Sequence, residues 1–172
     1  MTSSIKLYIA TTLDGYIADK NDELQWLFDV TGDGDNGYGE FLDTIDTVIM
    51  GKRTYDWLLE NEPDEWGYSG KDCYVFTHQA LPDNDHVKFV HPENLPDFVR
   101  TLKGNIWNVG GGELIGLFLE NQLIDEFQIT IAPVLLGDGI PLFPKGNYSE
   151  KLELIETKTY GQFVELHYRK IK

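Results

Sequence analysis

The chain has 172 residues, of which 41% are hydrophobic and 13% aromatic, and its formal net charge is -15. This length favours a single domain over residues 1–172 with a substantial core, and the apolar content excludes a disordered chain. The strong negative charge argues against nucleic acid and anionic membranes as partners. We therefore expect a small molecule as the partner.

Two further absences narrow the setting. No apolar run reaches the ~18 residues that a membrane span requires, and the apolar stretch after Lys6 is too short for a secretory leader. The single cysteine, Cys73, excludes an internal disulfide and a multi-cysteine metal site. We expect a reduced, cytoplasmic environment.

The N-terminal third predicts a strand followed by loops and short helices. Residues 4–10 have a strand pattern, and an Asp-Gly turn follows within 13–18. Residues 22–28 favour a short helix, the glycines and aspartates of 30–37 predict a loop, and 38–45 favour a second helix.

Strand and helix patterns then alternate up to residue 122. The predicted strands are 46–50, 72–77, 86–90 and 105–109. The predicted helices are 52–60, 92–103 and 112–122. This alternation is typical of strand–helix–strand units, and it predicts a largely parallel sheet.

The remainder of the chain predicts strands only. A long strand is expected over 124–137, and 152–160 and 163–170 are expected to form a hairpin around Gly161. The predicted fold class is α/β: a three-layer sandwich whose mixed, mostly parallel sheet of about eight strands ends in a C-terminal antiparallel hairpin.

Three consecutive glycines separate a predicted strand from a predicted helix. Gly110, Gly111 and Gly112 would expose backbone N–H groups at the positive end of the helix dipole, and a pyrophosphate could approach them closely. A plain tight turn explains them equally well. The spacing also differs from the G-x-G-x-x-G of a standard dinucleotide fold.

Two more strand ends carry groups that suit phosphate. Lys52 and Arg53 follow Gly51 at the start of a predicted helix, where cations oppose the helix dipole unless an anion binds. A solvated charged turn is the alternative interpretation. Thr77 and His78 supply a hydroxyl and an imidazole at a third strand end. Together these sites predict a ligand with several phosphates, such as a dinucleotide.

Several motifs resemble, in the same order, those of the dihydrofolate reductase-like superfamily. They are IATTLDGYIA (9–18), DTVIMGKRTY (46–55), YVFT (74–77), NVGGGELI (108–115) and IDEFQITIAPVLLGDGIPLF (124–143). The chain is most similar to the branch of the C-terminal reductase domain of bifunctional riboflavin-biosynthesis proteins. The resemblance implies a reductase that passes hydride from NADPH to a pterin- or pyrimidine-like ring, and a homodimer.

The resemblance also assigns roles to individual positions. Trp26 would lie near the substrate, Ala10 and Ile17 would meet the nicotinamide through backbone groups, and Thr77 and His78 would lie by the 2′-phosphate. The full set implied for the cofactor is Ala10, Ile17, Gly51, Lys52, Arg53, Thr54, Thr77, His78, Gly110, Gly111, Gly112, Glu113 and Leu114.

One departure from the superfamily concerns the catalytic carboxylate. Dihydrofolate reductases carry one in the helix after the tryptophan, whereas Asp29, Asp33, Asp35 and Glu40 all follow Trp26 here and none aligns clearly. Asp35 is the candidate retained beside Trp26. The departure argues against dihydrofolate as the substrate, and it keeps open an NADPH-binding protein without turnover.

The same acidic loop offers another interpretation. Residues 29–40 place oxygen-bearing side chains and Gly34 at the spacing of a calcium-binding EF-hand loop. Asn36 replaces the usual hydrophobic residue, however, and no second loop is present. We expect no metal site, and a mobile loop over the active site instead.

Overall fold

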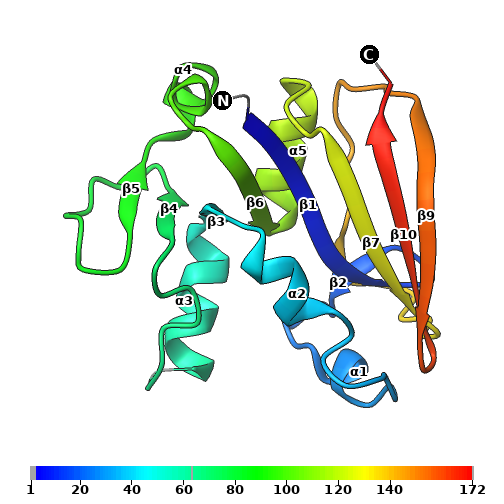
Figure 1. Ribbon diagram of the computed structural model, residues 1–172. Helices are drawn as coiled ribbons and strands as arrows, with labels where there is room; N and C mark the ends of the chain where they lie inside the picture. The colour runs from blue at the N-terminus through cyan, green and yellow to red at the C-terminus, as the bar shows by residue number, and fades with distance from the viewer. Residues whose placement is uncertain (1–2, 63, 172) are drawn as a thin grey trace.

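An eight-stranded sheet with strand order β5-β4-β3-β6-β1-β7-β10-β9 organises the computed structural model, which describes residues 3–62 and 64–171. Helices cover both faces (Figure 1). The strands are β1 Ser3–Thr12, β2 Tyr16–Ala18, β3 Thr47–Gly51, β4 Asp72–Phe76, β5 Lys88–Val90, β6 Gly104–Gly110, β7 Glu126–Ala132, β8 Ile140–Pro141, β9 Leu152–Tyr160 and β10 Phe163–Lys170. The α-helices are α1 Gln25–Phe28, α2 Tyr38–Asp43, α3 Lys52–Asn61, α4 Leu95–Arg100 and α5 Gly112–Glu120, and Pro92–Asn94 form a short 3₁₀ helix.

The sheet is mixed and mostly parallel. Strands β1, β3, β4, β5, β6 and β7 run parallel to their neighbours among this set. In the described part of this sheet, β10 pairs antiparallel with β7 and with β9, and the turn at Gly161 joins β9 to β10. The predicted fold class is therefore confirmed.

Alternation along the central strands builds a separate core on each face. On β3, Ile49 points to the core that α4 and α5 complete, whereas Val48 and Met50 point to the core beneath α2 and α3. Ile106 and Trp107 on β6 divide in the same way. Such nearly continuous apolar strands are typical of parallel sheets covered on both faces.

A third, smaller core forms where α1 meets the C-terminal hairpin. Trp26 packs there with Ala132 of β7 and Phe163 of β10. The loop before α2 rests on the same hairpin, since the Gln162 N–H donates to the Thr31 carbonyl at 2.9 Å. The acidic loop that the sequence predicts as mobile is thus tied to the hairpin turn.

The predicted long strand over 124–137 is wrong at both ends. Strand β7 covers Glu126–Ala132, and the chain then leaves the sheet at Pro133. Proline lacks the N–H that would continue the ladder. Further along, β8 pairs with β2 in a separate two-stranded sheet. No helix among the described residues is both long and apolar enough to cross a membrane.

Candidate functional site

The carboxyl ends of the parallel strands lie along one edge of the sheet. Ala10 lies near the end of β1, Gly51 ends β3, Thr77 follows β4 and Gly110 ends β6. All four belong to strands that run parallel in one sheet. The strand ends from which the sequence predicts a phosphate-rich ligand therefore share one edge.

Two helices begin side by side at this edge, each from a glycine. Gly51 precedes α3 and Gly111 precedes α5, both are extended, and neither helix has a side-chain cap. A Cβ placed on Gly51 would lie 3.7 Å from both the Gly110 carbonyl oxygen and the Gly111 nitrogen. Two adjacent uncapped helix N-termini present backbone N–H groups and positive dipole ends to the same space, which suits an anion.

Glycine is present at positions 110, 111 and 112 for different structural reasons. Gly110 has a φ of 105°, which side chains rarely adopt. A Cβ on Gly112 would lie 2.8 Å from the Pro141 carbonyl oxygen, so the approach of β8 requires glycine there. At Gly111, by contrast, φ is -78° and a Cβ would meet only the Thr54 hydroxyl at 3.7 Å. Gly111 is the position where the structure leaves room beside the backbone.

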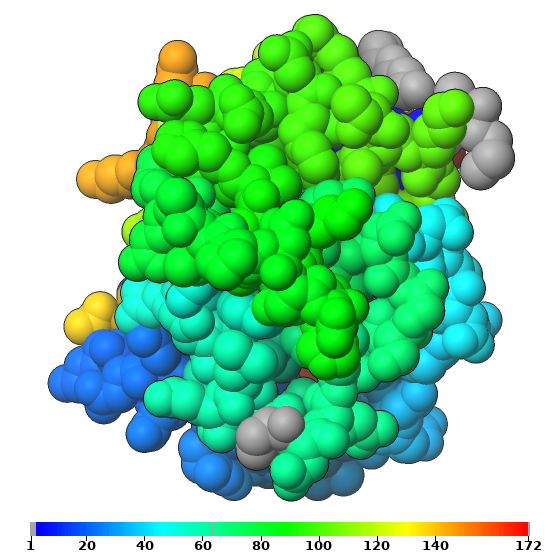
Figure 2. All heavy atoms as spheres, turned by 90° about the vertical axis from the view of Figure 1, so that its left-hand side faces the viewer, coloured from blue at the N-terminus to red at the C-terminus, as the bar shows by residue number. Residues whose placement is uncertain are grey.

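The two cations at the start of α3 are paired with carboxylates. The Lys52 ammonium lies 2.5 Å from Asp56, one turn along the helix. The Arg53 Nε donates to Asp22 at 2.9 Å, and the stretch before α1 lies beside α3 (Figure 2). Exposed ion pairs of this kind contribute little to stability, so both cations can exchange partners. The charged-turn interpretation and the phosphate interpretation both remain compatible with this geometry.

The third strand end brings two histidines together. Thr77 is buried, and its hydroxyl accepts from the Gln79 N–H at 3.2 Å, so its side chain serves the local turn. His78 is exposed and its ring packs edge-on against His91, with centroids 5.0 Å apart. His91 follows β5, a strand end from which the sequence predicts no site residue. The register of β4 with β5 places it there, which short-range spacing could not reveal.

Strand β1 is paired on only one side near its carboxyl end. It pairs with β6 from Ser3 to Leu7, but with β7 from Lys6 to Thr12. In the described residues, the edge of Ile9 and Ala10 that faces β6 therefore has no strand partner. A Cβ on Gly110 would lie 3.5 Å from the Ile9 side chain, so the glycine segment lies next to this unpaired part of β1. Backbone groups near Ala10 are thus placed for a ligand that also contacts the helix N-termini.

Other predicted cofactor residues have mainly packing roles. Leu114 is buried in the core under α5, and Ile17 packs against the same core from β2. Glu113 is exposed in the first turn of α5, where a carboxylate favours the helix dipole by itself. Any contact of Leu114 with a ligand at this edge would therefore use its backbone N–H.

The two predicted catalytic residues lie apart from the glycines. Trp26 is buried, and its indole Nε1 has no hydrogen-bond partner among the described residues. Asp35 is exposed, and its carboxylate accepts N–H groups of Gly37 at 3.0 Å and Gly39 at 2.9 Å. Asp35 thus stabilises the start of α2. Among the described residues, no three acidic, cysteine or histidine side chains are grouped as a metal site.

Beneath α1 and α2, one face of the sheet carries a polar residue that the sequence analysis missed. Glu165 of β10 is 4% exposed and lies in register with Thr130 of β7, which in turn lies in register with Ala10 of β1. Burial raises the pKa of the Glu165 carboxyl above its usual value. Alternation with the apolar Phe163 could have indicated that Glu165 points inward.

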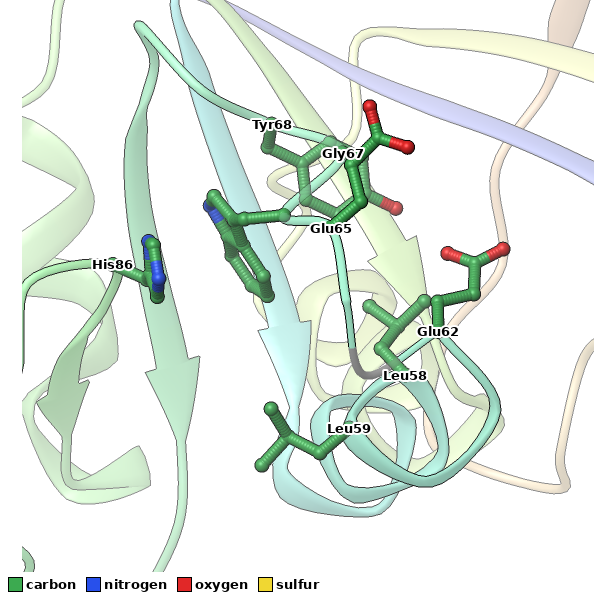
Figure 3. A pocket seen from close by; sticks show the side chains of 8 residues that line it. Leu58, Leu59, Glu62, Glu65, Gly67, Tyr68 and His86 are labelled. Carbon is green, nitrogen blue, oxygen red and sulfur yellow. The ribbon is translucent and has the colours of Figure 1, made fainter.

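A separate hollow lies at the other end of α3 (Figure 3). Leu58, Leu59 and Glu62 line it from the helix side, and Glu65, Gly67, Tyr68 and His86 close it. The Trp66 ring stacks on His86, with centroids 5.3 Å apart. Its two carboxylates do not suit phosphate, and it is remote from the α3 N-terminus. We therefore place the candidate site at the sheet edge.

The sequence profile of the RibD C-terminal domain family matches residues 3–166. The chain belongs to this family. This chain is 46% identical over 169 residues to the uncharacterized protein YwjB of Bacillus subtilis strain 168. The alignment covers 94% of this chain and 95% of YwjB.

Solved structures agree with the family assignment. A protein from Shewanella sp. PV-4, whose name places it provisionally in riboflavin biosynthesis, has a TM-score of 0.87 at 31% identity and covers 98% of this chain and 99% of its own. Dihydrofolate reductase from Enterococcus faecalis, solved with NADP(H), has a TM-score of 0.70 at 15% identity, covering 98% and 97%. This RibD-type domain therefore has the dihydrofolate reductase-like fold that its motifs indicate.

Proposed function

We propose that the protein is an NADPH-dependent reductase that transfers a hydride to a pterin- or pyrimidine-like small molecule. The observation that carries the proposal is the pair of uncapped, glycine-initiated helices α3 and α5, which begin side by side. Their N–H groups form an anion site in a chain whose net charge of -15 otherwise repels anions. The family and fold described above support the same activity.

The residues at this edge fit a dinucleotide with an extra phosphate. Gly111 leaves space for a pyrophosphate, and Lys52 and Arg53 offer exchangeable positive charge. The exposed His78 would meet the 2′-phosphate with a charge-assisted hydrogen bond when protonated. The unpaired edge of β1 near Ala10 would offer backbone groups to the nicotinamide carboxamide.

NADPH bound at this edge would supply a hydride to an electron-poor C=N or C=O carbon. The chain itself would hold two rings in contact and exclude water from them. Trp26 packs with Ala132 and Phe163, which share a sheet face with Ala10, and the 30–37 loop is bonded to the hairpin turn at Gly161. The substrate ring would lie against this face.

The reaction is tested by mixing the protein with NADPH and either a ribosylaminopyrimidine phosphate or dihydrofolate, and following the loss of NADPH absorbance. We expect NADPH to be oxidised with the pyrimidine compound. Binding of NADPH without turnover of either compound would favour a non-catalytic NADPH-binding protein. Absence of NADPH binding would contradict the proposal.

A further inference from the structure

Glu165 is a mostly buried residue of β10 that carries a carboxyl group. It is 4% exposed, and the described residues form no hydrogen bond or ion pair with its side chain. Two basic residues that act on its pKa also contact other carboxylates: Lys158, its register partner on β9, lies 4.0 Å from Glu156, and His167 Nε2 lies 3.1 Å from Glu126. Mostly buried carboxyl groups with a raised pKa are frequent at functional sites.

Glu165 lies on the sheet face against which the substrate ring is proposed to bind. Ala10, Thr130 and Glu165 lie in register on β1, β7 and β10 and share one face of the sheet. Two strand spacings separate Ala10 from Glu165, or roughly 10 Å. A ring that lies on this face between the two strands would be within reach of both the Ala10 backbone and the Glu165 side chain.

A second unpartnered polar group lies over the same face. The buried Trp26 indole Nε1 lacks a hydrogen-bond partner, and its ring packs against Phe163, which precedes Glu165 by two residues on the same strand face. One buried, unpaired donor and one mostly buried carboxyl on the same sheet face match a ligand with polar ring atoms. A structural role for Glu165 alone would leave the Trp26 donor unexplained.

We propose that Glu165 contacts the substrate and donates the proton that accompanies hydride transfer, an inference that rests on the proposed reductase function. The carboxyl O–H bond breaks as an N–H or O–H bond forms on the substrate atom next to the carbon that accepts the hydride. The substrate gains two electrons, the dihydronicotinamide loses them, and the carboxylate regains its proton from water.

The surroundings of Glu165 favour its protonated form. Burial is the largest cause of its raised pKa, and the Glu156 carboxylate adds to it, whereas Lys158 and His167 oppose it. Two tyrosines, Tyr8 of β1 and Tyr160 of β9, also lie near the carboxyl. Burial, and after it the charge of Glu165, raises the pKa of both phenols. A raised carboxyl pKa suits a general acid near neutral pH.

The first arm of the test needs no substrate. Because the folded-state pKa is raised, the stability that Glu165 contributes is present at low pH and is lost as pH rises through that pKa. As pH rises above the usual carboxyl range, the Glu165→Gln variant should therefore gain melting temperature relative to wild type. The exposed α3 variant Glu60→Gln, whose carboxylate does not act on Glu165, should not. An identical pH dependence of wild type and Glu165→Gln would overturn the proposal.

The second arm measures NADPH affinity and turnover separately. Glu165→Gln should bind NADPH as wild type does, yet reduce the ribosylaminopyrimidine phosphate or dihydrofolate about 100-fold more slowly or worse. The wild-type rate should fall as pH rises, and Glu165→Asp should recover part of it. Wild-type protein that binds NADPH but reduces neither compound would overturn the role of Glu165 and leave the cofactor site standing. Loss of NADPH binding in wild type would instead overturn the proposed function.

Discussion

At the scale of single residues, Gly111 and Gly112 give opposite predictions. Gly111→Val should remain folded, because its backbone is extended and its Cβ has room, at a cost of roughly 1 kcal/mol for the changed N-cap. It should lose NADPH binding, since the side chain would occupy the pyrophosphate space. Gly112→Val should lose about 1–3 kcal/mol or more, because its Cβ would clash with the Pro141 carbonyl.

Thermal melting with and without NADPH separates these effects. If the Gly111→Val variant melts near wild type and is still stabilised by NADPH, Gly111 is only a turn residue and does not provide the space for the pyrophosphate. In the sequence the three glycines look equivalent. The structure requires glycine at position 112 because β8 approaches it, and no local sequence pattern connects β8 to α5.

Cys73 gives a second prediction at this scale. Burial raises the pKa of its thiol to about 11, and it packs beneath α3. Because the thiolate is the reactive form, the folded protein should react very slowly with a thiol reagent at pH 8, and denatured protein rapidly. Reaction of folded protein at the rate of a free thiol would contradict this burial. Cys73 therefore has a packing role in the core beneath α3.

At the scale of elements, the Asp-Gly turn after β1 is joined to the loop after β7. The Asp14 carboxylate accepts the Thr12 hydroxyl at 2.6 Å, the Gly137 N–H at 2.8 Å and the Leu136 N–H at 3.1 Å. These bonds, with that of Thr12 the largest cause, lower the pKa of Asp14. Two motifs that are distant in the sequence thus form one unit beside the unpaired end of β1.

Asp14→Ala should loosen this unit. We expect faster hydrogen exchange at Leu136 and Gly137 and weaker NADPH binding, because the adjacent end of β1 loses support. Wild-type protection should persist at neutral pH and decline as pH falls through the lowered pKa, since protonation weakens the carboxylate as an acceptor. Unchanged exchange in Asp14→Ala, judged against an exposed control such as Asp64→Ala, would contradict the coupling.

Element types were more predictable than element ends. The alternation over 46–122 predicts β3, α3, β4, β6 and α5, because their apolar spacing reflects burial on two faces. The strand expected over 124–137 ends at Ala132 because Pro133 interrupts the ladder, and β8 pairs with β2 through tertiary contacts. Glu165 was missed because its significance depends on the register of three strands.

At the scale of the whole molecule, the net negative charge opposes the binding of an anion that the candidate site favours. The net charge of -15 repels anions, yet two uncapped helix N-termini lie side by side at one edge of the sheet, next to Lys52 and Arg53, whose carboxylate partners an anion could replace. A phosphate-bearing cofactor would therefore be attracted to this edge rather than elsewhere on the surface. The homodimer that the resemblance implies stays a prediction.

The most direct test of the account is a fluorescence titration of the protein with NADPH and with NADH under the same salt conditions. A charge-assisted hydrogen bond contributes roughly 1.5–3 kcal/mol, so we expect NADPH to bind about tenfold more tightly or better. The variant His78→Ala should lower the ratio of NADPH affinity to NADH affinity, whereas His86→Ala, a change at a distant histidine, should leave that ratio unchanged. Equal affinities for the two cofactors, or binding of neither, would contradict the assignment of this edge to NADPH.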